Sequence, residues 1–150
     1  MKKFIPIISL AILVACETKQ KPAEEEKVQT EEMESKTESD SSFVFFKYPE
    51  NGATVPSPVF VEMGVSGMQI EPAGEVKAGF GHHHILINQT GWPEGEVIPM
   101  SDSTKHYGKG QTDASLELPA GEYTLSLQFA DGVHTSYGPS MAASITITVE

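Results

Sequence analysis

The stretch Gly121-Glu122-Tyr123-Thr124-Leu125-Ser126-Leu127-Gln128-Phe129 decides the fold class. From Tyr123 to Phe129 every second residue is apolar, and the residues between them are polar. Successive side chains of a β-strand point to opposite faces, so this alternation is typical of a strand that has one face against a core. Pro119 and Ala120, just before it, predict a turn that introduces the strand.

Short apolar runs separated by turn residues continue on both sides of this strand. They predict further strands at residues 43–48, 58–65, 82–88, 114–118 and 144–149. No stretch shows a convincing helical period of 3.6 residues. The run Gly121–Leu125 resembles the tyrosine corner of immunoglobulin-like domains. We therefore expect an all-β fold, an antiparallel immunoglobulin-like β-sandwich, over residues 42–150.

The N-terminal part of the chain is typical of an export signal. Lys2 and Lys3 precede an apolar run at residues 4–14 that is too short to span a bilayer as a helix. The run ends in Leu13-Val14-Ala15-Cys16, which resembles the bacterial lipoprotein signal. That resemblance implies removal of residues 1–15, acylation of Cys16 with fatty acids such as palmitate, and a membrane-anchored lipoprotein. The alternative is an ordinary export signal with a spare cysteine.

Residues 16–41 form a predicted tether between the lipidated Cys16 and the folded domain. They are rich in Glu, Lys, Thr, Ser and Gln and contain no aromatic residue, so we expect an acidic, disordered linker. The predicted location is the cell envelope, and the outer membrane is the default. The sequence does not distinguish the periplasmic face of that membrane from its surface face.

Charge and cysteine content exclude several classes of function. The chain has a formal net charge of −11 and contains no arginine, so a basic patch for nucleic acid is not expected. Cys16 is the only cysteine. Once it is acylated, no thiol is left for a disulfide, a thiolate nucleophile or a cysteine zinc site. A metal site would have to use histidine, carboxylate or methionine.

All five histidines lie in the predicted sandwich, at three places. His82 and His84 should share one face of their strand, whereas His83 should point to the other. Imidazole is a good ligand for copper, zinc and nickel. We predict that His82 and His84 meet His106 and His134 at strand ends. These four residues are the predicted metal ligands of a copper or zinc site.

Other residues are secondary candidates for this site. His83 and Asp131 could join the ligand set, and Asp102 or Asp131 could accept the second N–H of a ligating imidazole. Thioethers favour Cu(I), and the domain offers Met63, Met68, Met100 and Met141. Met63 alternates with apolar residues and is expected to fill the core.

The sequence does not contain the usual signatures of an active site. No serine lies in a nucleophile elbow, and the Gly108–Thr112 segment lacks the strand–loop–helix context of a phosphate-binding loop. We assign no catalytic or cofactor-binding residue. An open coordination position on a bound metal would still allow hydrolytic or redox chemistry, so enzymatic activity stays open.

Several motifs resemble one uncharacterised bacterial family, domain of unknown function 4399. They include Gly81-His82-His83-His84-Ile85-Leu86-Ile87, His106-Tyr107-Gly108-Lys109-Gly110-Gln111-Thr112 and Asp131-Gly132-Val133-His134. The resemblance implies a secreted or lipid-anchored β-domain and supplies no activity. The chain has Asn88 where the family often has Asp, and Tyr107 where it often has Phe.

Two functions follow from these observations. The first is a lipid-anchored domain that binds copper or zinc for storage, delivery or detoxification in the envelope. The second is a non-catalytic binding or structural module whose histidines stabilise loops. In that alternative the long loop, residues 91–112, would recognise a protein or glycan partner through Trp92 and Tyr107.

Overall fold

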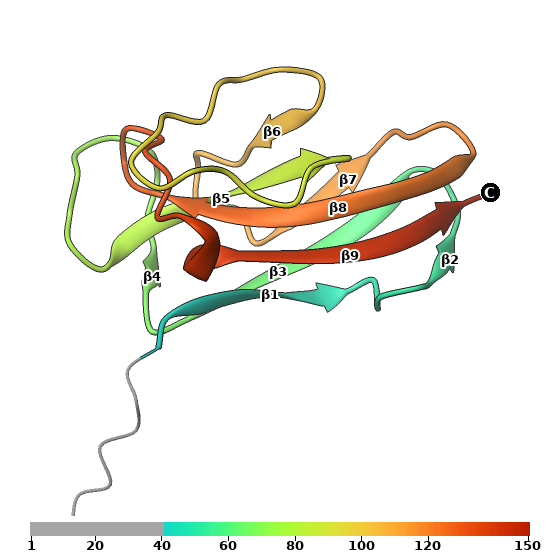
Figure 1. Cartoon of the computed structure of the whole chain (residues 1–150), viewed down its shortest axis with the longest axis horizontal. Helices are drawn as coiled ribbons and strands as arrows, with labels where there is room; N and C mark the ends of the chain where they lie inside the picture. The colour runs from blue at the N-terminus through green and yellow to red at the C-terminus, as the bar shows by residue number, and fades with distance from the viewer. Residues whose placement is uncertain (1–40) are drawn as a thin grey trace, which may run out of the picture. The chain divides into compact units, whose positions relative to one another are not determined.

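The computed structural model describes residues 41–150 (Figure 1). The predicted signal, Cys16 and nearly all of the predicted tether lie outside the described residues. The strands are β1 (Phe43–Tyr48), β2 (Thr54–Val55), β3 (Val59–Ser66), β4 (Gln69–Ile70), β5 (Phe80–Ile87), β6 (Thr104–His106), β7 (Asp113–Leu116), β8 (Gly121–Ala130) and β9 (Ala142–Val149). A single turn of 3-10 helix, η1 (Pro139–Met141), precedes β9. Within residues 41–150, no helix is long and apolar enough to cross a membrane.

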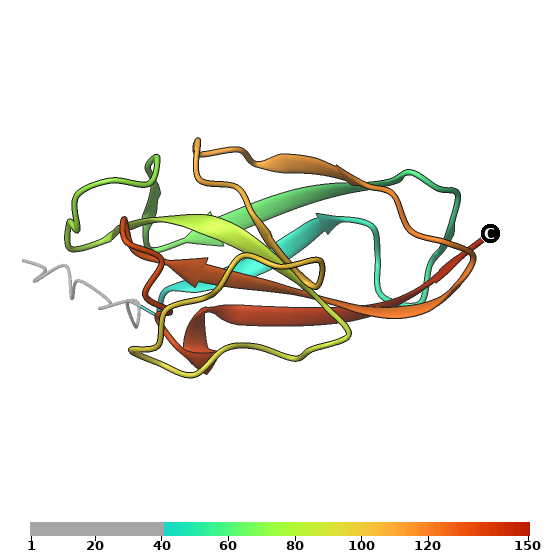
Figure 2. The same cartoon turned by 90° about the horizontal axis from the view of Figure 1, so that it is seen from above.

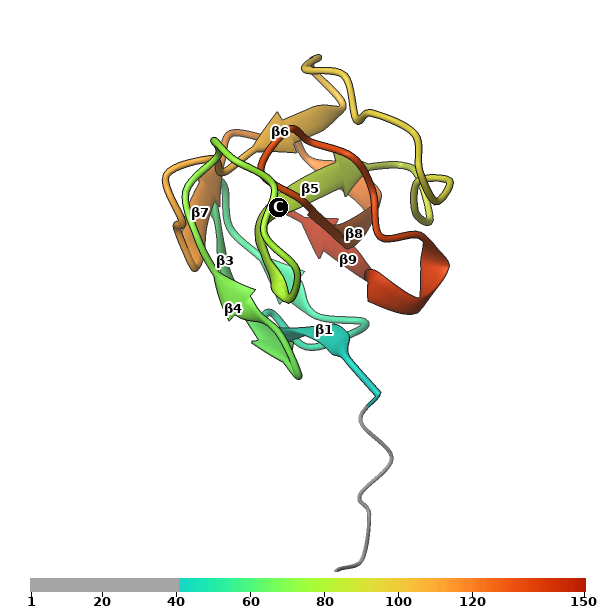
Figure 3. The same cartoon turned by 90° about the vertical axis from the view of Figure 1, so that its left-hand side faces the viewer.

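The strands form two sheets. One has the order β1-β3-β7, and the other has the order β2-β9-β8-β5-β4, with β6 also paired to β5. The pairings are antiparallel except for the short pairs β2–β9 and β4–β5. Figure 3 shows the sheet of β1, β3 and β7 facing the sheet that contains β5, β8 and β9. The predicted all-β sandwich is therefore confirmed.

A tyrosine corner fixes the start of β8. The hydroxyl of Tyr123 donates a hydrogen bond to the backbone carbonyl of Pro119 at 3.0 Å. This contact links a strand residue to the turn just upstream, as in other immunoglobulin-like domains. The predicted corner is present, and it supports the immunoglobulin-like assignment.

The core lies between the two sheets and is built from alternate residues of their strands. β3 contributes Val59, Val61 and Met63, and all three are fully buried. On the facing sheet, the core residues are Ile85, Leu125, Leu127, Phe129, Ile147 and Val149. The alternation predicted for residues 123–129 is thus confirmed, and Met63 fills the core as expected.

The outer face of β5 and β8 is also buried, because the part of the long loop that precedes β6, residues 91–103, covers it. Leu86 and Ala130 on this face pack against Ile98 and Trp92 of the loop. Figure 2 shows the loop in yellow on the opposite side of the molecule from β7. β5 is therefore covered on both faces, and this cover creates a sheltered place for polar side chains on its outer face.

Gln128 attaches the loop to the outer face of the sheet. Its side chain is fully buried, and its Oε1 accepts a hydrogen bond from the backbone N–H of Trp92 at 2.9 Å. Its Nε2 donates to the carbonyls of Gly138 at 2.9 Å and Met141 at 3.2 Å. One side chain thus joins β8, the long loop and η1.

Candidate metal centre

Three elements bring four histidines together on the outer face of the larger sheet. β5 contributes His82 and His84, and the register of β6 places His106 directly opposite His84. His134 follows the end of β8 in a turn closed by its own backbone N–H, which donates to the carbonyl of Asp131 at 3.0 Å. The four predicted ligands come from three separate stretches of sequence and are therefore neighbours in the fold.

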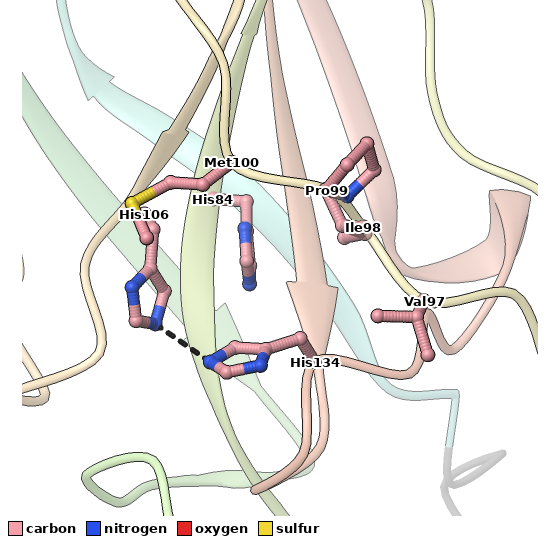
Figure 4. Close-up of a pocket in the computed structure, with 7 residues that line it drawn as sticks. All are labelled: His84, Val97, Ile98, Pro99, Met100, His106 and His134. Atoms are coloured by element: carbon pink, nitrogen blue, oxygen red, sulfur yellow. Dashed lines mark hydrogen bonds between the residues drawn. The ribbon is translucent and has the colours of Figure 1, made fainter.

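Short contacts link the Nε2 atoms of the four rings. Nε2 of His82 lies 3.2 Å from Nε2 of His84 and 3.2 Å from Nε2 of His106. Nε2 of His134 lies 3.1 Å from Nε2 of His106, as the dashed line in Figure 4 marks. His82, His84 and His106 each offer a ring nitrogen within 4.8 Å of the other two, so these three residues could hold a metal ion.

Hydrogen bonding among the rings does not account for this arrangement. A ring nitrogen carries either one N–H or one lone pair, so each Nε2 can make one in-plane hydrogen bond. Four such atoms support at most two hydrogen bonds, whereas three short contacts join them. Imidazole nitrogens bind zinc at about 2.0–2.1 Å, which separates two tetrahedral ligands by about 3.3 Å. The observed spacing is close to that value.

Burial favours the neutral form of His82, His84 and His106, which is the form that can donate a lone pair. Loss of solvation lowers the pKa of His82 to about 4, with a further lowering by His106 and His134 and an opposing contribution from Asp131. Burial, followed by the neighbouring histidines, lowers the pKa of His84 to about 3. The pKa of His106 is also lowered, first by burial and then by His134. Neutral imidazole is the form that binds metal.

His83 lies on the opposite face of β5 and does not join the cluster. Its side chain is fully buried in the core, where its ring meets Phe129 edge-on at a centroid distance of 5.1 Å. Neither ring nitrogen has a protein hydrogen-bond partner. Burial lowers its pKa to about 4, with smaller contributions from His82 and Lys47. The strand alternation predicted for the three consecutive histidines is present.

Asp131 shapes the turn that presents His134. Its Oδ1 accepts hydrogen bonds from the backbone N–H groups of Val133 at 2.9 Å and Thr135 at 2.8 Å. His134 has a φ of +71°, a left-handed conformation that costs energy for a residue with a side chain. The carboxylate therefore acts as a brace for the turn. The other acidic candidate, Asp102, is exposed in the loop before β6.

Two glycines permit the positions of His106 and His134, and the sequence had not singled them out. A Cβ on Gly108 would lie 2.1 Å from Cε1 and Nε2 of His106. A Cβ on Gly132 would lie 2.3 Å from the carbonyl oxygen of Glu75. Gly108 follows His106 by two residues, and Gly132 precedes His134 by two residues. This spacing is the sequence feature that could have identified both glycines as supports of the histidines.

A cavity of about 250 Å³ opens in front of the cluster. It is lined by His84, Val97, Ile98, Pro99, Met100, His106 and His134 (Figure 4). Of the four domain methionines considered above, Met100 lines this cavity, whereas Met63 and Met141 are buried in the core and Met68 packs against the core.

Asn88, which replaces the Asp often found in the family, lies in the turn after β5. Its Oδ1 accepts a hydrogen bond from the backbone N–H of Thr124, and its φ is +57°. Its side chain therefore stabilises this turn.

The fold and the cluster define a class: an immunoglobulin-like β-sandwich with a partly buried cluster of four histidines on one outer face. Within that class, the chain belongs to the family described as domain of unknown function 4399, whose model matches residues 61–150. The match includes all five histidines. No curated protein and no solved structure matches the chain significantly.

Proposed function

We propose that this domain binds a transition metal ion, copper or zinc, through His82, His84, His106 and His134. The observation that carries the proposal is the set of three contacts of 3.1–3.2 Å that link the Nε2 atoms of His84, His82, His106 and His134 in that order. One ion could use the lone pairs of His82, His84 and His106 at once, and His134 could join after a small movement of its turn. Hydrogen bonds cannot satisfy all of these contacts.

The environment of the cluster supports the same proposal. Neutral imidazoles could serve as hydrogen-bonding scaffold, but a scaffold would be expected to pair its polar atoms. The four Nε2 atoms can share at most two hydrogen bonds, and His82 and His84 are 0% and 2% exposed. Burying several rings with incomplete hydrogen bonding costs stability, and an ion bound at Nε2 would offset that cost because the assembled site binds it more tightly than the unfolded chain does.

The alternative, a partner-binding long loop, is less well supported by the placement of its two anchors. Trp92 packs against Leu86 and Ile98, and its Nε1 is buried. Tyr107 packs against the main core, and burial raises its pKa to about 12. Anchors of a binding surface are expected to be open to a partner. The packing of Trp92 and Tyr107 therefore favours a role in stabilising the fold over a role in recognising a partner.

The proposed setting is the cell envelope. A chain acylated at Cys16 would hold the domain at a membrane, and the metal site would face the periplasm or the cell surface. Storage, delivery and detoxification of the metal are all compatible with such a setting. An exported domain without a free thiol can hold copper or zinc by histidine chemistry alone.

Metal titration of histidine variants tests the proposal. The chain carrying Cys16→Ser, which removes its only thiol, would be purified without a histidine tag and titrated with Cu(II) and Zn(II). We expect about one tightly bound ion per chain and a raised melting temperature. The double variant His82→Ala/His84→Ala should lose both. The control is His83→Leu, on the same strand but the opposite face, and it should retain both. Full affinity in the double variant would overturn the proposal.

A further inference from the structure

One methionine side chain that lines the cavity beside the histidines is largely exposed to solvent. Met100 is 79% exposed, although it lines the same cavity as His84, His106 and His134. Figure 4 shows Met100 on the side of the pocket where His106 lies. Met100 therefore does not fill the core, and its side chain borders both the solvent and the cavity.

The backbone just before Met100 is tied to the segments that carry two of the histidines. The backbone N–H of Ile98 donates to the carbonyl of His134 at 2.9 Å. The carbonyl of Pro99 accepts a hydrogen bond from the hydroxyl of Thr104, the first residue of β6, which also carries His106. The backbone just before Met100 is thus tied to the segments that carry His106 and His134, and the side chain of Met100 is itself flexible.

The donor set and the pocket walls distinguish between metals by charge. The described residues that line the cavity include no carboxylate, and Val97, Ile98 and Pro99 form apolar walls. Asp131, the carboxylate that acts on His82, has its Oδ1 engaged by two backbone N–H groups. Transferring a divalent ion to neutral ligands in such surroundings costs more than transferring a monovalent one, because solvation energy grows with the square of the charge.

We propose that the ion taken by this site is Cu(I), with Met100 as an exchangeable thioether ligand at the entrance. Imidazole and thioether are both neutral, and the thioether is soft, which suits Cu(I) among the first-row ions. The inference rests on the proposed metal binding by the histidines. An exposed sulfur ligand gives Cu(I) a route in and out by stepwise ligand exchange, so it favours delivery over permanent storage.

Substitution of single methionines tests this inference. The chain carrying Cys16→Ser would be compared with the same chain carrying Met100→Leu, and with Met68→Leu as the control that removes a thioether packed against the core. Cu(I) affinity would be measured by competition with a colorimetric Cu(I) chelator under anaerobic conditions. Zn(II) and Cu(II) affinity would be measured in parallel, and X-ray absorption of the Cu(I)-loaded chain would report sulfur ligation.

We expect Met100→Leu to lower Cu(I) affinity about tenfold or more and to remove a sulfur ligand, while Zn(II) affinity stays within about twofold and Met68→Leu changes neither. Unchanged Cu(I) affinity in Met100→Leu, or Zn(II) binding without Cu(I) binding in the parent chain, would overturn this inference and leave the histidine site standing. A parent chain that binds none of the three ions would overturn the proposed function together with this inference.

Discussion

Replacement of His83 by Leu should stabilise the metal-free protein, and the gain should grow as the pH falls. His83 is fully buried against Phe129, and neither of its ring nitrogens has a protein partner. Leucine has a similar volume and no polar atoms, so it can occupy the same space in the core.

The magnitude at pH 7.5 follows from two opposing effects. Removing a buried, unpaired polar group stabilises by about 1–3 kcal/mol. Losing the edge-on contact between His83 and Phe129 costs about 0.5–1.5 kcal/mol. We expect a net increase of about 1 kcal/mol in the free energy of unfolding.

The effect at acid pH comes from the lowered pKa of His83. The unfolded chain binds a proton on this residue below pH 6.5, but the folded chain does so only near pH 4. The contribution of neutral His83 to the free energy of unfolding is therefore fully present above pH 6.5, and it is lost as the pH drops from 6.5 to about 4. At pH 5 this single residue should cost the wild type about 2 kcal/mol, so His83→Leu should be more stable than wild type by about 3 kcal/mol there.

Urea unfolding of the metal-free chain at pH 7.5 and pH 5, followed by the fluorescence of Trp92, measures both values. His84→Leu is the matched variant on the other face of β5, and it should also reduce the acid sensitivity but lose metal affinity. Equal pH dependence in wild type and His83→Leu would refute the assignment of His83 as a buried neutral group. A loss of metal affinity in His83→Leu would refute the separation of the two faces.

Three further predictions concern the support and the acid response of the site. Gly108→Ala should displace the ring of His106, since the new Cβ would lie 2.1 Å from it, and should lower Zn(II) affinity about tenfold in a titration competed by a zinc-binding dye. Gly74→Ala, whose Cβ would have no neighbour within 4 Å, is the control and should keep the Zn(II) affinity of the wild type. Gln128→Ala should lower the free energy of unfolding by about 3 kcal/mol, because it leaves the N–H of Trp92 and the carbonyl of Gly138 unpaired; a loss below about 1 kcal/mol in urea unfolding would contradict this. In the variant His134→Ala, Zn(II) affinity should change little between pH 7.5 and pH 6, because the pKa values of His82 and His84 are lowered to about 4 and about 3 and that of His106 is also lowered. A steep decline near pH 6.5 in a pH-dependent titration of this variant would show ordinary, solvated histidines.

Much of the fold was predictable from local patterns. The alternation from Tyr123 to Phe129 gave the core face of β8, and the run before it gave the tyrosine corner to Pro119. The opposite orientations of His83 and its two neighbours also followed from strand geometry alone. The short strand β6 was not predicted, because Thr104-Lys105-His106 has no apolar alternation and becomes a strand only by pairing with β5.

The sequence by itself determined that this protein is a β-sandwich in which His83 faces away from His82 and His84, because side-chain alternation and turn chemistry depend on the backbone of a few neighbouring residues. The expectation that all the histidines lie at strand ends was wrong for His82 and His84, which lie inside β5 because this strand begins at Phe80. The tertiary structure decided which groups meet. Strand register placed His106 opposite His84, and the turn braced by Asp131 brought His134 to them. The long loop covered their face and placed Met100 at the opening. These contacts join residues far apart in the chain, and their geometry depends on packing of the whole domain, which no local pattern encodes.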